Sequence, residues 1–74
     1  MISSMAGAKK FQKFVMERGN RRFVIEEDLP AVGWYLYVFL DGKCVNDYLQ
    51  DTLDKAKEFA FEEFGISAIG WKED

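Results

Sequence analysis

Histidine is absent from this sequence of 74 residues, and cysteine and proline occur once each. Histidine is the commonest general base near neutral pH and the commonest metal ligand, so its absence argues against both an enzyme and a metal site. The scattered glycines form no phosphate-binding loop. We therefore predict a protein that is not an enzyme and has no metal and no cofactor. The single Cys44 excludes an internal disulfide and favours a cytoplasmic location.

Long hydrophobic runs are also lacking. No apolar run approaches the roughly 18 residues that span a membrane, and the opening MISSMAGAKK has no apolar core typical of a signal peptide. We expect no association with a membrane. Residues 1–8 are small and are predicted to be disordered, and residues 9–74 form a single domain. Hydrophobic residues make up 49% and aromatic residues 16%, enough for a core without disulfide or metal cross-links.

The charge is distributed unevenly along the chain. The net charge is −3, but residues 1–22 carry six basic residues and one acidic residue. A basic arm on an acidic body can attach to an anionic partner, to the body itself or to a second copy. The segment 9–18 within this arm fits two structures. Phe11, Phe14 and Val15 have helical spacing, but a strand that turns at Gly19-Asn20 fits almost as well.

Three further strands are indicated by β-branched and aromatic residues. The segments 22–27 and 34–40 are separated by a loop with Pro30 and Gly33, and a return strand covers about 43–49. Asp41-Gly42 predicts a type I′ hairpin turn. With that turn and regular pairing, Tyr35 faces Tyr48 on one side of the sheet, and Trp34 faces Leu49 on the other.

A helix is expected over about 52–64. Asp51 or Thr52 can cap it, and an apolar stripe runs along one side of it. Gly65 provides the left-handed residue that commonly ends a helix. The tail after Gly65 either crosses the edge of the core or forms a short strand.

These elements define an α+β fold, an antiparallel meander of three or four strands with one C-terminal helix on one face. Strand 34–40 is apolar at every position, so both of its faces need cover. We expect the helix to cover the face with Leu36, Val38, Val45 and Leu49. The other face is expected to carry the partner-binding residues Tyr35, Tyr37, Phe39 and Tyr48. A small protein partner, a second subunit, a ligand or Phe11 and Phe14 of segment 9–18 are its candidate covers.

These features lead to two functional hypotheses. The first is a non-catalytic protein–protein interaction or regulatory module, a homodimer or other homo-oligomer. The alternative is a nucleic-acid-binding module, because aromatic sheet faces stack bases and basic side chains contact phosphates. Its candidate residues are the basic ones of the N-terminal arm: Lys9, Lys10, Lys13, Arg18, Arg21 and Arg22.

Residues 33–60, GWYLYVFLDGKCVNDYLQDTLDKAKEFA, resemble the HicB-type antitoxin domain. That family has a strand, a Gly-containing link with a cysteine, and D-T-x-x-x-A before a helix with further alanines. Asp51, Thr52, Ala56 and Ala60 match this pattern, while the link is shortened to Asp41–Cys44 and DYLQ is inserted. The resemblance implies a protein partner held by the sheet or the helix, and dimerisation through strands.

A helix at 9–18 would give the order αβββα, which is similar to the double-stranded-RNA-binding domain. Lys55-Ala56-Lys57 followed by Ala60 resembles the second helix of that family. The family places a lysine cluster at the start of this helix, where the present sequence has Asp51 and Asp54. The resemblance therefore implies a shared topology more than a shared function.

Overall fold

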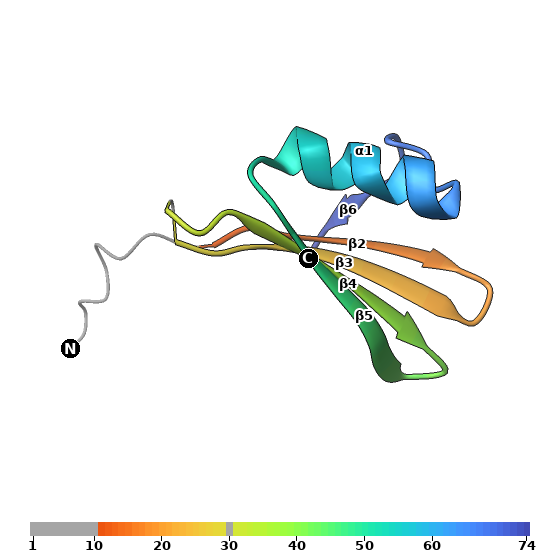
Figure 1. Ribbon diagram of the computed structural model, residues 1–74. Coiled ribbons are helices and arrows are strands. Elements are labelled where there is room, and N and C mark those ends of the chain that lie inside the picture. Colours follow the sequence, from red (N-terminus) through yellow and green to blue (C-terminus); the bar gives the residue numbers. More distant parts are fainter. Residues whose placement is uncertain (1–10, 30) are drawn as a thin grey trace.

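The computed structural model describes residues 11–29 and 31–74, and its elements form one antiparallel sheet covered on one side by a helix (Figure 1). In chain order these elements are β2 (Lys13–Arg18), β3 (Arg21–Glu27), β4 (Trp34–Leu40), β5 (Lys43–Gln50), α1 (Leu53–Phe64) and β6 (Lys72–Glu73). The strand order is β5-β4-β3-β2-β6. The predicted α+β class, strand meander and C-terminal helix are confirmed. The predicted disorder of residues 1–8 lies outside the described residues.

Segment 9–18 is a strand from Lys13 onward, so the helical alternative is wrong. Alternation explains this outcome: Phe14 and Met16 pack against the core beneath the helix, while Val15 between them belongs to the opposite face. The chain turns at Gly19, which has a φ of 62°, and returns as β3. Residues 11–29 and 31–74 therefore do not show the αβββα order of the double-stranded-RNA-binding domain.

The β4–β5 hairpin and a short fifth strand complete the meander. Asp41 and Gly42 have φ angles of 51° and 84°, as the predicted type I′ turn requires. The tail adopts the second predicted alternative, because β6 pairs with β2 at the sheet edge opposite β5.

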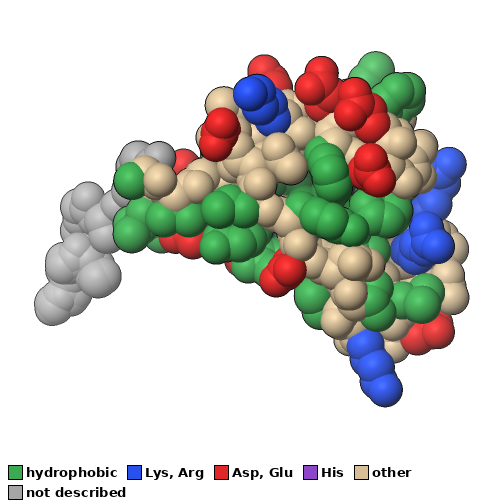
Figure 2. Space-filling model, viewed as in Figure 1, with side chains coloured by type: hydrophobic (Ala, Val, Ile, Leu, Met, Phe, Trp, Pro, Cys, Tyr) green, Lys and Arg blue, Asp and Glu red, His purple; other side chains and the backbone are tan. Residues whose placement is uncertain are grey.

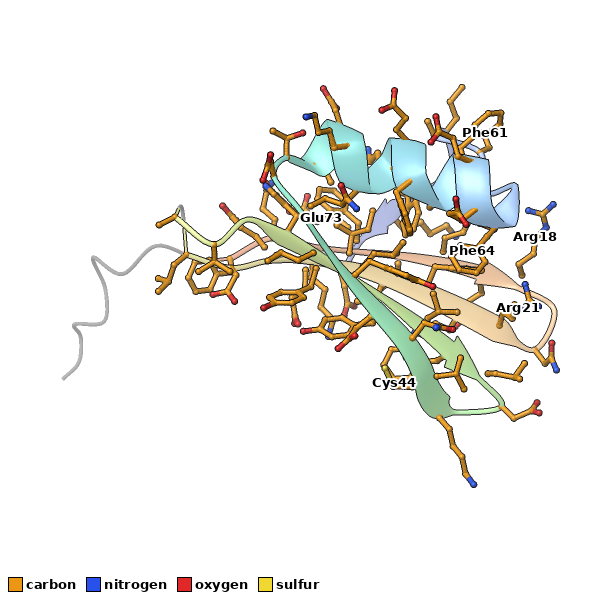
Figure 3. The ribbon with its side chains drawn as sticks, viewed as in Figure 1. Arg18, Arg21, Cys44, Phe61, Phe64 and Glu73 are labelled. Carbon is orange, nitrogen blue, oxygen red and sulfur yellow. The ribbon has the colours of Figure 1, made fainter. Side chains whose placement is uncertain are left out.

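The helix begins and ends at the predicted residues. The Thr52 hydroxyl oxygen accepts a hydrogen bond from the Lys55 amide at 3.1 Å, and Gly65 adopts the left-handed conformation with a φ of 70°. Ala56 and Ala60 are fully buried, and their small side chains allow the helix to approach the sheet closely. Phe64 points toward the sheet and contacts Phe23, with 5.4 Å between ring centroids (Figure 3).

The core lies between α1 and this covered side of the sheet. Its fully buried large side chains are Phe23, Ile25, Leu36 and Ile66. The predicted burial of Leu36 and Val38 beneath the helix is confirmed, since they are 0% and 2% exposed.

The predicted faces of Val45, Tyr48 and Leu49 in β5 are wrong. A β-bulge shifts the register between Val38 and Phe39, so that Phe39 pairs with Cys44 but Val38 pairs with Asn46. Val45 is the extra residue of the bulge and is 49% exposed. Because side chains alternate between faces, this one-residue shift exchanges the faces of Tyr48 and Leu49.

Candidate functional site

The side of the sheet opposite α1 is not covered by any element of residues 11–29 and 31–74 (Figure 1). We call this side the open face. Three neighbouring strands supply its centre, with Tyr35, Tyr37 and Phe39 on β4, Arg22, Val24 and Glu26 on β3, and Lys13, Val15 and Glu17 on β2. Strand β5 adds Cys44, Asp47 and Leu49. The open face is the candidate functional site.

Three of the four predicted partner-binding residues lie together on the open face. The rings of Tyr35 and Tyr37 are stacked, with centroids 5.7 Å apart and planes inclined by 16°, and Phe39 follows two residues further along β4. All three rings are half-buried, but only by their neighbours within the sheet. They form a continuous aromatic ridge along β4.

The placement of Tyr48 on this face is wrong. Tyr48 pairs with Leu36 on the covered side, and its ring lies 4.6 Å from Phe59 and 6.2 Å from Phe64 of the helix. Leu49 takes its place beside Tyr35 and is 48% exposed. Figure 2, which views the molecule from the β5 side, shows hydrophobic side chains at the surface along the seam between helix and sheet.

The part of segment 9–18 that is described does not cover the open face. Phe14 lies on the covered side, where its ring centroid is 6.5 Å from that of Trp34. The Lys57 ammonium lies 5.3 Å from the same Phe14 centroid. Phe11 is 44% exposed. The predicted cover by Phe14 is therefore wrong.

The predicted basic residues are divided between the two sides of the sheet. Lys13 and Arg22 belong to the open face. Arg18 and Arg21 pair across the tip of the β2–β3 hairpin, on the side that carries the helix (Figure 3). The other two predicted residues, Lys9 and Lys10, lie outside the described residues.

A shallow depression of about 340 Å³ lies at the centre of the open face. Its lining combines apolar and charged groups: Lys13, Arg22, Val24, Glu26, Tyr37, Phe39 and Cys44. Val24 at its floor is only 5% exposed. Burial raises the pKa of the Tyr37 phenol, and the negative charge of Glu26 adds to this rise. Like an ordinary tyrosine, Tyr37 is protonated at neutral pH and can donate a hydrogen bond.

Sequence reasoning missed several residues of the open face. Val15 was detectable only once β2 was known to be a strand. Val24 and Glu26 belong to β3, and strand alternation assigns them to this side once β3 is paired with β4. Leu49 and Asp47 were hidden by the bulge, for which the sequence carries no distinct signal.

The described residues contain no group of three or more acidic, cysteine or histidine side chains that could hold a metal ion. Their helix, α1, is too short and too polar to span a membrane. No protein-family model, no curated protein and no solved structure matches this chain.

Proposed function

We propose that this protein is a small non-catalytic protein–protein interaction or regulatory module that acts as a homodimer through its open face. The observation that carries the proposal is the aromatic ridge Tyr35–Tyr37–Phe39 on a sheet side that no described element covers. Exposed apolar patches with aromatic centres and charged surroundings are typical of interaction surfaces. The exposed free thiol of Cys44 suits the reducing cytoplasm, which we propose as its location.

Light scattering coupled to gel filtration tests this proposal with two matched variants. Tyr37→Glu places a charge at the centre of the open face, and Phe61→Glu places one on the outer side of α1, where Phe61 is 59% exposed (Figure 3). We expect the mass of a dimer for the unaltered chain and for Phe61→Glu, and a monomer for Tyr37→Glu. A monomeric unaltered chain at hundreds of micromolar would refute the proposal.

The regulatory form of the proposal follows from the resemblance to HicB-type antitoxins. Its support is the strand-to-helix junction, where Thr52 caps α1 and the matching alanines Ala56 and Ala60 are buried against the sheet. We expect a neighbouring gene for a small toxin-like protein that co-purifies with this chain. A neighbouring product that does not bind the chain would count against the antitoxin type while leaving the homodimer intact.

Nucleic-acid binding is the second candidate function. Its specific support is that Lys13 and Arg22 border the same depression as Tyr37 and Phe39, so that phosphate contacts and base stacking can occur together. Gel-shift assays at low salt with single-stranded RNA and DNA test it. Arg22→Glu should abolish the shift, whereas Arg21→Glu, on the other side of the sheet, should retain it. No shift at tens of micromolar protein would reject this candidate.

A further inference from the structure

The charges at the centre of the open face alternate in sign along both strands and across them. On β2 the order is Lys13, Val15, Glu17, and beside it on β3 the order is Glu26, Val24, Arg22. Each charge therefore has an opposite charge as its neighbour on the adjacent strand. In one of these pairs, the Arg22 Nε lies 3.9 Å from a Glu17 carboxylate oxygen. The two rows of charges are separated by a row that is apolar at its centre.

This middle row crosses all five strands of the sheet. The strand registers place its members side by side in the order Asp47, Tyr37, Val24, Val15 and Lys72. On one side of it lie Tyr35 and Glu26, and on the other side lie Phe39 and Arg22. A rotation by 180° about the middle row thus exchanges an aromatic ring with an aromatic ring, and an acid with a base.

We propose, resting on the homodimer proposed above, that two copies pack their open faces together about a two-fold axis that runs along the middle row, across the strands. Sheets that pack face to face lie about 10 Å apart, close enough for side chains to meet. Glu26 then lies opposite Arg22 of the second copy, and each open face is complementary to itself, as a two-fold interface requires. Tyr37 meets Tyr37 of the second copy at the centre.

Other two-fold axes fit the surface less well. An axis along β3 places Glu26 against Glu26 of the second copy and Arg22 against Arg22. An axis between β2 and β3 keeps opposite charges together, but it places the β4 rings against the two-residue strand β6 and leaves β5 without a partner. The axis across the strands satisfies the charges and buries the aromatic ridge at the same time.

The proposed axis places Asp47 opposite Asp47 of the second copy, and Lys72 opposite Lys72 of the second copy. Asp47 lies on β5 and Lys72 on β6, at opposite edges of the sheet, and both are exposed. Water and salt weaken the repulsion between like charges at such rims. An axis parallel to the strands can place at most one of these two edges opposite the same edge of the second copy.

Cross-linking of single cysteines distinguishes these arrangements. The variants are Asp47→Cys, Lys72→Cys and, as an off-axis control, Glu17→Cys, each combined with Cys44→Ser and treated with a bismaleimide that spans about 10 Å. We expect both Asp47→Cys and Lys72→Cys to give at least fivefold more cross-linked dimer than Glu17→Cys, which lies two residues from the axis. Gel filtration of each variant before the reaction reports whether it is a dimer.

Each outcome has a distinct meaning. A dimer that cross-links at only one of the two edges, or equally well at Glu17→Cys, overturns the axis and leaves the proposed homodimer in place. A monomer before the reaction contradicts both the homodimer and the axis. Cross-linking at both edges, at a yield that falls on dilution, supports the arrangement.

Discussion

The adjacent residues Tyr48 and Leu49 offer the sharpest test of the bulged register, because the bulge exchanges their environments. Tyr48 packs beneath α1 against Phe59 and Phe64, and Leu49 is 48% exposed on the open face. We therefore expect Tyr48→Ala to destabilise the monomer much more than Leu49→Ala does. Regular pairing of β4 with β5 predicts the reverse order.

The expected magnitudes follow from the burial and ring contacts. Truncation of a buried aromatic residue costs about 3–5 kcal/mol, and Tyr48 is only half-buried. Its two ring contacts each contribute about 0.5–1.5 kcal/mol. Half of the burial cost and the sum of the two contacts are alternative estimates that both centre on about 2 kcal/mol, which corresponds to a fall in Tm of about 8–16 °C for a domain of this size. For Leu49→Ala we expect less than about 1 kcal/mol, since its side chain has few contacts to lose.

Urea denaturation followed by circular dichroism measures both values. The comparison is made at the lowest practical protein concentration, because self-association adds to apparent stability. A larger loss for Leu49→Ala, or equal losses for the two variants, would refute the bulged register and with it the composition of the open face.

Three further predictions concern the backbone and the open face. Gly33→Ala should destabilise by about 1–3 kcal/mol in the same assay, because Gly33 has a φ of 118° and an added Cβ meets the Gln50 carbonyl oxygen; an unchanged midpoint would contradict this. Deletion of Val45 should shift Tm by only a few degrees, because it removes the bulge and keeps Tyr48 beneath the helix; an unfolded product would contradict the pairing. The pKa of Tyr37 in the folded protein lies above its pKa in the unfolded chain. The stability that this difference contributes is therefore complete below about pH 10 and is lost at higher pH. In an absorbance titration at 295 nm, the difference between the unaltered chain and Tyr37→Phe should therefore have its midpoint above about pH 10, and a midpoint at or below about pH 10 would contradict the raised pKa.

Local signals in the sequence predicted most of the fold. Asp41-Gly42 indicated a turn that needs two positive φ angles, and Thr52 and Gly65 marked the ends of the helix. These residues act through their own backbone and nearest neighbours, so their effect is visible without the rest of the chain. The β-branched and aromatic residues likewise identified β3 and β4.

The faces of the β5 residues beyond the bulge, and the choice of a strand for β2, depended on distant contacts. The bulge at Val45 allows Tyr48 to reach the rings of Phe59 and Phe64, which lie more than ten residues further along the chain. In segment 9–18, Phe11, Phe14 and Val15 fit a helical spacing, whereas Phe14 and Met16 fit a strand. Pairing with β3 and β6 selects the strand, and the sequence alone does not show that pairing.

The aromatic ridge on the open face is best tested by hydroxyl-radical footprinting over a dilution series, read by mass spectrometry. Tyr37, at its centre, is compared with Phe61 on the outer side of α1 as an internal reference. The homodimer predicts that Tyr37 is protected at high protein concentration and becomes reactive on dilution, while Phe61 stays reactive throughout. A Tyr37 reactivity that does not change with concentration would contradict the claim that a second copy covers this face.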